Sequence, residues 1–456
     1  MSEDILVIGG GIAGITAARN AADYGAKVYL VDDTPSIGGI MARLDKTFPT
    51  NDCSICIEAP QMYEVNNHPN IEILTHTELR KVKKTSEGFK VRLVKKARFI
   101  DEDACTGCGA CIDACPVTVP DELDGKIGGT RKLVSMPFPQ AVPNVPTIDP
   151  DCRYGRMRDQ GACIGDCVVD CSQCRECPIA LCVKACIQEG KDAVRLWQAN
   201  KNLNLTVKSI IVAAGVRSTE PADGAYGYNV FPNVITNMQF ERLMNAGGPQ
   251  SGEIVRPSDG KHAEKIAWIQ CANRGLSEGL LPYCSKVCCM VATKQTIITK
   301  EHDPDAEAIV FYNSLKAYGK AFWEFYQKAV DKGVRYVYSR PGDVYEDPET
   351  RNLVLTYVDP GTGERVDEEV ELLVLSTGLA PNDRNERLAK ALKIQLNHLG
   401  FFEEKDPIRA AFETDVEGVY VCGGATGPID ISESVVQGCG ASMKALSRRT
   451  QEASNG

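Results

Sequence analysis

The side chains best able to do chemistry in this chain of 456 residues are its twenty cysteines. They occur in groups: none lies in the first 50 residues, twelve lie between Cys105 and Cys186, and four lie between Cys271 and Cys289. A chain whose thiols are kept reduced uses grouped cysteines mainly as metal ligands. The grouping therefore predicts cofactor-binding segments set into a scaffold that is otherwise poor in cysteine.

The clearest motif is ACTGCGACIDACPV, in which Cys105, Cys108, Cys111 and Cys115 have the spacing C-x2-C-x2-C-x3-C-P. This spacing is typical of [4Fe-4S] ferredoxins, and its fourth cysteine binds the other cluster in two-cluster ferredoxins. Eight more candidate ligands follow: Cys152, Cys163, Cys167, Cys171, Cys174, Cys177, Cys182 and Cys186. Twelve cysteines would complete three clusters with four thiolates each, and two clusters with four spare thiols is the alternative.

A second set of candidate ligands lies in PYCSKVCCMVATK, which contains Cys284, Cys288 and Cys289, and in KIAWIQCANRG, which contains Cys271. Four thiolates suit either a tetrahedral zinc ion or a [4Fe-4S] cluster. The spacing C-x12-C-x3-C-C is not that of a usual zinc knuckle, and two adjacent cysteines argue against inert buried thiols. The residues alone therefore leave a zinc ion and a [4Fe-4S] cluster open as ligands of this site.

Three further residues are candidates for catalytic roles. Cys53 and Cys56 form a C-x2-C pair that could be a redox disulfide, ligands of a cluster contributed by another segment, or inert thiols. The segment CCMVATKQTII predicts a helix that begins at the double cysteine, so Lys294 would lie little more than one turn beyond Cys289. Lys294 is then either a solvent-facing lysine or a charge near a cofactor.

The N-terminal segment predicts the scaffold that must position these groups. The β run ILVIGGG precedes a helical segment and a second strand, KVYLVDD, and glycines fall as G-x-G-x-x-G at Gly9, Gly11 and Gly14. These glycines allow a tight turn and close approach to a pyrophosphate, which the N–H groups at the helix start, around Ile12 and Ala13, would hold. The acidic residues Asp32 and Asp33 end the second strand, where a carboxylate would bind the ribose. The pattern predicts a dinucleotide-binding turn.

Other segments resemble flavoproteins that have two dinucleotide-binding domains. PSIGGIMARLD supplies Gly38, Gly39 and Met41 at the expected second flavin contact, and SIIVAAGVRS and LLVLSTGLAP resemble the crossings between the FAD and nicotinamide domains. The segment TDVEGVYVCGGATGPIDISESVVQG resembles the turn that closes over the flavin, although the usual Asp is replaced by Gly424. The cofactor-binding candidates from the last three segments are Ala214, Gly215, Thr377, Gly378, Gly423, Gly424, Pro428 and Ile429.

The nicotinamide site expected of such flavoproteins is not evident. The strand in the corresponding place, KIAWI, is followed by Gln270 and Cys271 where the glycines of a second turn should begin. A pyrophosphate could not approach that turn closely. We therefore expect FAD but no NAD(P)H at the second domain.

The order of these motifs resembles the A-subunit of heterodisulfide reductase over essentially the whole chain. PTNDCSICIEAP, the ferredoxin insert, PFPQAVPNVPTIDP, the double-cysteine segment and GPIDISESVVQG carry the resemblance. It implies an oxidoreductase that transfers electrons through FAD and three or four [4Fe-4S] clusters, with electron bifurcation as one mode. It also implies that Cys271, Cys284, Cys288 and Cys289 bind one of these clusters, of an unconventional kind. The implied partners are heterodisulfide reductase B and C subunits, ferredoxin, a hydrogenase or formate dehydrogenase adaptor and a second copy of the chain. The alternatives are a component of a quinone-interacting oxidoreductase and a non-catalytic iron-sulfur scaffold.

We accordingly expect an α/β protein with a thioredoxin-reductase-like pair of dinucleotide-binding domains and an inserted α+β ferredoxin domain. The net charge of −10 argues against a nucleic-acid partner. The absence of a signal peptide or an apolar stretch of about 18 residues leads us to expect a cytoplasmic protein without a membrane span. The expected divisions are a first FAD-domain segment (1–98), a ferredoxin insert (99–194), a second FAD-domain segment with a linker (195–260), a degenerate nicotinamide-type domain (261–371) and a C-terminal FAD-domain segment (372–456).

Overall fold

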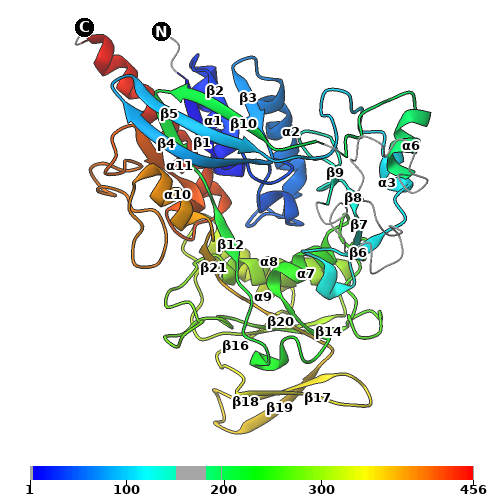
Figure 1. The fold of residues 1–456 in the computed structure, drawn as a ribbon. Coiled ribbons are helices and arrows are strands. Elements are labelled where there is room, and N and C mark those ends of the chain that lie inside the picture. Colours follow the sequence, from blue (N-terminus) through cyan, green and yellow to red (C-terminus); the bar gives the residue numbers. More distant parts are fainter. Residues whose placement is uncertain (1–3, 150–180, 197, 455–456) are drawn as a thin grey trace.

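The fold consists of two parallel-sheet modules and an insert that touches both (Figure 1). The structure is a computed structural model and describes residues 4–149, 181–196 and 198–454. Six of the expected cluster ligands lie outside these ranges: Cys152, Cys163, Cys167, Cys171, Cys174 and Cys177. Among the residues within these ranges, no helix is both long and apolar enough to cross a lipid bilayer.

The first module, called the FAD module below, is built on a five-stranded parallel sheet. Its central strand, ILVI, is fully buried, as expected for a parallel strand covered on both faces. The strands in sheet order are β22 (Val419–Val421), β11 (Ser209–Val212), β1 (Ile5–Ile8), β2 (Val28–Val31) and β3 (Ile71–Leu74).

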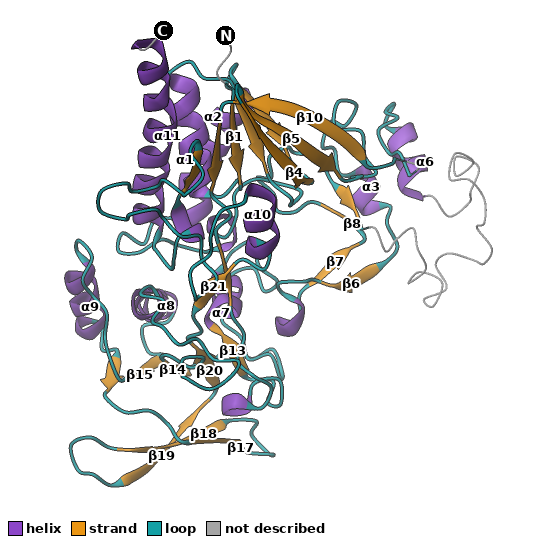
Figure 2. Ribbon diagram, turned by 60° about the vertical axis from the view of Figure 1, so that its left-hand side comes forward, coloured by secondary structure: helices purple, strands orange, loops and turns teal. Residues whose placement is uncertain are grey.

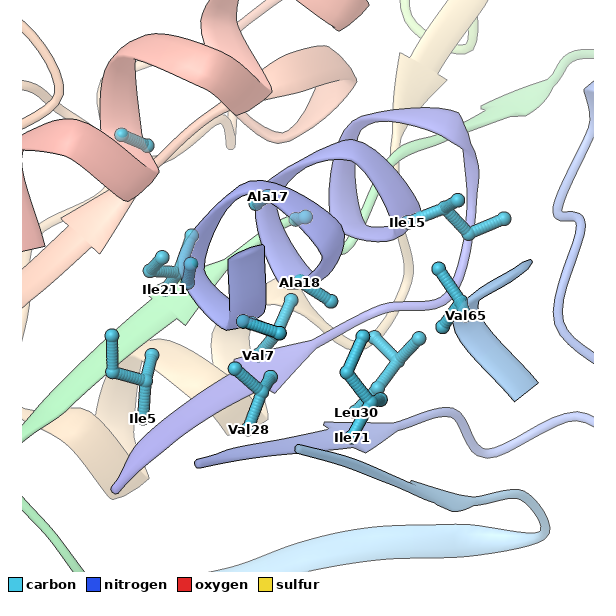
Figure 3. Packing of buried hydrophobic residues seen from close by; sticks show 14 of the residues in the cluster. Ile5, Val7, Ile15, Ala17, Ala18, Val28, Leu30, Val65, Ile71 and Ile211 are labelled. Atoms are coloured by element: carbon cyan, nitrogen blue, oxygen red, sulfur yellow. The ribbon is translucent and has the colours of Figure 1, made fainter. Parts of the chain in front are cut away.

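Different elements cover the two faces of this sheet. On one face, α1 (Ile12–Asp23), α2 (Ser54–Asn67) and α11 (Ile431–Ser454) pack against the strands, and Val7, Ile15, Val28 and neighbouring residues form the core there (Figure 3). The other face is covered by a three-stranded antiparallel sheet and by α10 (Asn385–Leu392). The covering strands are β4 (Thr77–Thr85), β5 (Gly88–Lys95) and β10 (Lys201–Val207).

The second module, called the cysteine module below, repeats this arrangement (Figure 2). Helices α7 (Asn237–Met244), α8 (Cys288–His302) and α9 (Phe322–Asp331) cover one face of a parallel sheet, and a three-stranded antiparallel sheet covers the other. The parallel strands in order are β13 (Val234–Thr236), β20 (Leu372–Leu375), β14 (Lys265–Ile269), β15 (Glu307–Phe311) and β16 (Arg335–Val337). The covering strands are β17 (Asp343–Glu346), β18 (Leu353–Val358) and β19 (Arg365–Val370).

The module boundaries differ from those expected from the sequence. Strand β20 lies within the expected C-terminal FAD-domain segment (372–456), but it pairs with β13 and β14 in the cysteine module. Likewise, residues 195–260 were expected to belong to the FAD domain and a linker, but β13 and α7 within this range belong to the cysteine module. The reason is that LLVL is buried on both sides and fits only between two other strands.

The chain crosses between the modules at one antiparallel strand pair. It leaves the FAD module through β12 (Val216–Ser218) and returns through β21 (Leu379–Pro381), and these two short strands pair with each other. The two segments expected to be crossings therefore lie side by side.

The insert contains a small core of its own and two anchors. Its described elements are α3 (Ala110–Asp113), β6 (Thr118–Pro120), β7 (Thr130–Lys132), β8 (Val134–Ser135), β9 (Thr147–Ile148) and α6 (Leu181–Gln188). Buried Arg98 donates to the carbonyls of Pro35 and Val145 and so ties the insert to the FAD module. Asp124 accepts a bidentate pair of bonds from Arg242 of the cysteine module, Nε to Oδ1 and Nη2 to Oδ2, both at 2.9 Å. The insert is thus held against both modules.

Candidate cofactor sites

The glycine turn between β1 and α1 has the geometry that a pyrophosphate needs. Gly9 has φ 108°, and a Cβ there would lie 2.2 Å from the Ala213 carbonyl oxygen. A Cβ on Gly14 would lie 1.8 Å from the Gly9 oxygen, whereas one on Gly11 would meet nothing closer than 3.8 Å. No side chain caps α1, so its first N–H groups, from Ile12 onward, are left for an anion. The uncapped N–H groups and the open space beside Gly11 therefore suit the pyrophosphate of a bound dinucleotide.

The two acidic residues after β2 have different environments. Asp32 accepts hydrogen bonds from the N–H groups of Gly10 (2.6 Å) and Thr34 (2.8 Å), which fixes its carboxylate beside the turn. Asp33 instead forms an ion pair with Arg384 at 2.5 Å, and burial raises its pKa. Asp32 is therefore the better placed of the two to bind a ribose.

Most of the other expected flavin contacts lie along the same edge of the FAD module, whereas Thr377 and Gly378 follow β20 of the cysteine module and lie at its cysteine pocket. Ala214 and Gly215 follow β11, Gly423 and Gly424 follow β22, and Pro428 and Ile429 precede α11. The carboxyl ends of parallel strands meet at one edge of a sheet, where α/β proteins bind their ligands. The loop with Gly38, Gly39 and Met41 joins this edge through a bridge between Gly11 and Gly38.

The glycine that replaces the usual Asp has a local explanation. A Cβ on Gly424 would come within 3.1 Å of Val216 and 3.3 Å of the Gly215 carbonyl carbon. A carboxylate-bearing side chain would be crowded at this position, so the ribityl chain must be held by other groups.

Cys271, Cys284, Cys288 and Cys289 line one pocket of the cysteine module, with a volume of about 440 Å³ including its open mouth. The four residues reach it from a loop after β14 and from the first turn of α8. The predicted helix start at the double cysteine is confirmed. Cys288 Sγ donates to the Thr377 carbonyl (3.2 Å) and Cys289 Sγ to the Ser314 carbonyl (3.5 Å).

The electrostatics of this pocket bear on its ligand. Burial and then the neighbouring cysteines raise the pKa of Cys288, and burial raises the pKa of Cys289 to about 11. Four thiolates could not coexist here without a compensating cation. A [4Fe-4S] cubane binds one thiolate at each of its four iron atoms. The four cysteines that line this pocket therefore fit a [4Fe-4S] cluster as its ligands.

A second thiol-lined pocket lies in the insert. Cys105, Cys108 and Cys111 line it together with Cys186 of α6, and its volume is about 320 Å³. Cys115 lies instead near Cys182; burial raises the pKa of Cys182 to about 11, and Cys115 contributes to that rise. The fourth cysteine of the motif is thus separated from the first three, as in two-cluster ferredoxins.

Lys294 lies in the interior, so the solvent-facing alternative is wrong. Its ammonium donates to the Glu241 carboxylate (2.8 Å) and to the Lys46 carbonyl (2.7 Å), and its side chain is 1% exposed. Lys46 belongs to the FAD module, whereas Glu241 belongs to α7. Glu241 could not be recognised from the sequence, because a single acidic residue in an amphipathic helix gives no signal of a buried partner.

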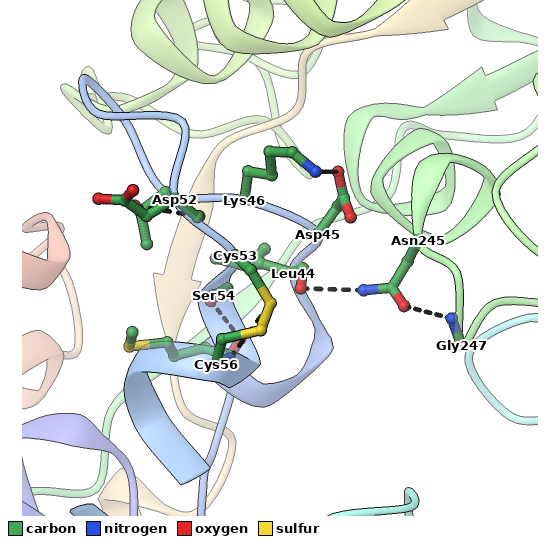
Figure 4. Close-up of a disulfide and its surroundings, with 11 residues drawn as sticks. Leu44, Asp45, Lys46, Asp52, Cys53, Ser54, Cys56, Asn245 and Gly247 are labelled. Carbon is green, nitrogen blue, oxygen red and sulfur yellow. Dashed lines mark hydrogen bonds and ion pairs between the residues drawn. A yellow bond between two sulfur atoms is a disulfide. The ribbon is translucent and has the colours of Figure 1, made fainter. Parts of the chain in front are cut away.

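Of the three alternatives for Cys53 and Cys56, the structure has a disulfide between them (Figure 4). The pair lies at the start of α2, where Cys53 is the N-cap and its sulfur accepts the N–H of Cys56 at 3.2 Å. The next residue, Ser54, donates its hydroxyl to the Met41 carbonyl at 2.8 Å. The residue between the two cysteines that follows Cys53 is therefore hydrogen-bonded to the loop expected to contact the flavin.

The second dinucleotide turn is absent from the described part of the cysteine module. Strand β14 ends at Ile269 and α8 does not begin until Cys288, so a long loop replaces the tight turn. Gln270 is buried at the position of the first glycine, with 2% exposure. Both features favour loss of the nicotinamide site.

Comparison with known families and structures defines the class of protein. The sequence model of the FAD dependent oxidoreductase family matches residues 4–50, and that of the 4Fe-4S binding domain matches residues 98–120. The crystal structure of T. acidophilum thioredoxin reductase aligns with a TM-score of 0.50 at 14% identity, covering 98% of this chain and 100% of that one. The chain thus has a thioredoxin-reductase-like fold, with an N-terminal segment typical of FAD dependent oxidoreductases and a 4Fe-4S binding segment.

Closer relatives identify the family. The chain is 43% identical to the iron-sulfur A-subunit of the CoB–CoM heterodisulfide reductase of Methanocaldococcus jannaschii, over 97% of this chain and 63% of the relative. It is equally similar, with the same coverage, to the A-subunit of the H2/formate:CoB-CoM heterodisulfide,ferredoxin reductase of Methanococcus maripaludis. The chain belongs to the family of heterodisulfide reductase A-subunits. It spans about 63% of the length of these relatives.

Proposed function

We propose that this chain is the FAD- and [4Fe-4S]-containing electron-transfer subunit of a heterodisulfide-reductase-like complex in the cytoplasm. It passes electrons between ferredoxin, or a hydrogenase or formate dehydrogenase partner, and a disulfide- or thiol-type acceptor on B- and C-like subunits. Three or four clusters take part, and electron bifurcation at the flavin is the proposed mode. The name of the Methanococcus maripaludis relative, which includes H2 or formate, ferredoxin and a heterodisulfide, supports this choice of partners.

The observation that carries the proposal is the short connection between the cysteine pocket and the flavin edge. Gly378 lines the cysteine pocket, and Cys288 contacts the carbonyl of the preceding Thr377. A few residues further on, Asn382 donates to the Ala214 carbonyl at the flavin edge (3.0 Å). A cluster in the pocket and a flavin at the edge would therefore be neighbours, as direct electron transfer requires.

The residues of the chain would divide the work as follows. The glycine turn and Asp32 hold the dinucleotide, and Cys271, Cys284, Cys288 and Cys289 hold a cluster. When bound, FAD supplies the conversion between two-electron and one-electron transfer. Lys294 joins the two modules, since its ammonium pairs with Glu241 of α7 and donates to the Lys46 carbonyl of the FAD module.

Anaerobic reduction by ferredoxin tests the proposed function. The chain is loaded with FAD and reconstituted with iron and sulfide, and reduced ferredoxin is then added while the flavin absorbance is followed. We expect flavin reduction in the wild type and in Cys439→Ser, whose thiol lies on α11 outside both cysteine pockets. Cys288→Ser should retain FAD but lose rapid flavin reduction. A wild-type flavin that ferredoxin does not reduce, or unchanged kinetics in Cys288→Ser, would refute the proposed route.

A further inference from the structure

The Cys53–Cys56 pair is the one disulfide among the cysteines that the structure describes, since the other twelve are free thiols. It is also accessible: Cys56 is exposed and Cys53 is half-buried. A disulfide that only stabilises a fold gains most by closing a long loop, whereas this one joins residues three positions apart. Stabilisation alone therefore explains it poorly.

The position of the pair makes its two sulfurs chemically different. Cys53 is the N-cap of α2, a helix of 14 residues, and its sulfur already accepts the Cys56 N–H at 3.2 Å. A thiolate on Cys53 would keep this bond and would also lie at the positive end of the helix dipole, which stabilises a negative charge. Cys53 is thus the better leaving group, and Cys56 is the sulfur that an incoming thiolate can reach.

We propose that Cys53–Cys56 is a thiol–disulfide exchange site for small thiols and their disulfides. An external thiolate attacks Cys56 Sγ, the Cys53–Cys56 bond breaks, and Cys53 leaves as the thiolate. A second external thiolate then attacks the external sulfur of the mixed disulfide, the bond from that sulfur to Cys56 breaks, and Cys56 leaves as the thiolate. Two external thiols have then become one disulfide, and the protein pair has gained two electrons. The reverse reaction reduces an external disulfide, with Cys53 resolving the mixed disulfide on Cys56.

The site also lies beside a contact between the two modules (Figure 4). Cys53 pairs as an isolated β-bridge with Lys46, whose carbonyl accepts the Lys294 ammonium. Asn245 of the cysteine module donates to the neighbouring Leu44 carbonyl at 3.0 Å. The exchange site is therefore fixed to the backbone segment on which the cysteine module rests.

Equilibration with glutathione tests the proposal on the purified full-length chain. The protein is held at a series of reduced-to-oxidised glutathione ratios, acid-quenched and alkylated, and the peptide containing both cysteines is analysed by mass spectrometry. We expect Cys53 and Cys56 to convert together as a two-electron couple within that series. With Cys53→Ser, Cys56 should retain roughly one glutathione per chain because the resolving thiol is gone. Cys56→Ser should take up far less, and Cys439→Ser should behave as wild type.

Three results would overturn the proposal. The pair could remain a disulfide even in excess dithiothreitol, which would make it structural. It could remain reduced at every glutathione ratio, which would make the thiols inert. It could also resist alkylation in the anaerobic protein while the double Cys53→Ser, Cys56→Ser variant loses iron, which would make the pair cluster ligands. None of these readouts depends on ferredoxin, so the outcome is independent of the proposed electron route.

Discussion

The Lys294 ammonium lies 2.7 Å from Glu241 Oε1, and both side chains are only 1% exposed. Gln295 Nε2 and the N–H of Asp45 also donate to the Glu241 carboxylate. One buried charge pair thus joins α7, α8 and the Asp45–Lys46 segment of the FAD module. Removing one member of such a pair leaves an uncompensated charge in the interior.

Lys294→Met should therefore destabilise the protein by roughly 3–5 kcal/mol, the usual effect of breaking a buried ion pair. Urea unfolding followed by fluorescence measures this loss. The double variant Glu241→Gln, Lys294→Met should recover some of it because no charge is left buried. Lys261→Met, whose lysine is 78% exposed, serves as the control and should change little. Equal stability of Lys294→Met and Lys261→Met would contradict the importance of the pair.

The same variant tests whether the Lys294 charge acts on the flavin. If it does, the flavin reduction potential of folded Lys294→Met should fall, because a positive charge near the reduced cofactor is lost. An anaerobic spectroelectrochemical titration at matched FAD and iron content measures the potential. An unchanged potential would confine Lys294 to a structural role.

The sequence predicted those features of the structure that depend on local patterns. The turn at Gly9, Gly11 and Gly14 could be predicted because few residues allow that backbone, and the helix at Cys288 could be predicted from the apolar spacing after it. The pairing of Lys294 with Glu241 could not, because 53 residues separate them and each is ordinary in its own helix. The prediction that β20 belongs to the FAD domain was wrong for a similar reason, because the sequence of a buried strand does not indicate which strands it pairs with.

His76 makes stability depend on pH. Burial, with Arg98 and Lys96 nearby, lowers its pKa from 6.5 to about 4, and neither ring nitrogen has a hydrogen-bond partner. Between these values the unfolded chain binds a proton that the folded chain does not. This contribution to stability is therefore complete above pH 6.5 and is lost as the pH falls to about 4, by up to about 3 kcal/mol.

The variant His76→Asn isolates this effect. Asn tolerates the left-handed backbone that His76 adopts, with φ 52°. Unfolding free energies measured from pH 7.5 to pH 4.5 should fall more steeply for the wild type than for the variant. Parallel curves would show that His76 is protonated in the folded protein as readily as in the unfolded chain.

Nicotinamide nucleotides should not reduce the flavin of this chain directly. Gln270 and Cys271 occupy the place of the second glycine turn, and the loop that follows belongs to the cysteine pocket. Anaerobic mixing of the FAD-loaded chain with excess NADH or NADPH should leave the flavin absorbance unchanged, while dithionite bleaches it. Rapid stoichiometric bleaching by either nucleotide would show that a binding site exists after all.

Total iron should report how many of the cysteine groups are filled. If every group binds a cubane cluster, anaerobic analysis should give roughly twelve to sixteen iron atoms per chain and as many sulfides, at four of each per cluster. A value near eight would mean that two clusters account for all the iron and that at least one group of thiols is empty.

The cluster in the pocket of Cys271, Cys284, Cys288 and Cys289 is the central claim. The most direct measurement is the difference in iron and FAD content between the wild type and a variant in which Cys288 and Cys289 are both serine, reconstituted side by side. We predict a loss of about four iron atoms per chain with FAD unchanged. Identical iron content in the two proteins would show that this pocket holds no iron-sulfur cluster.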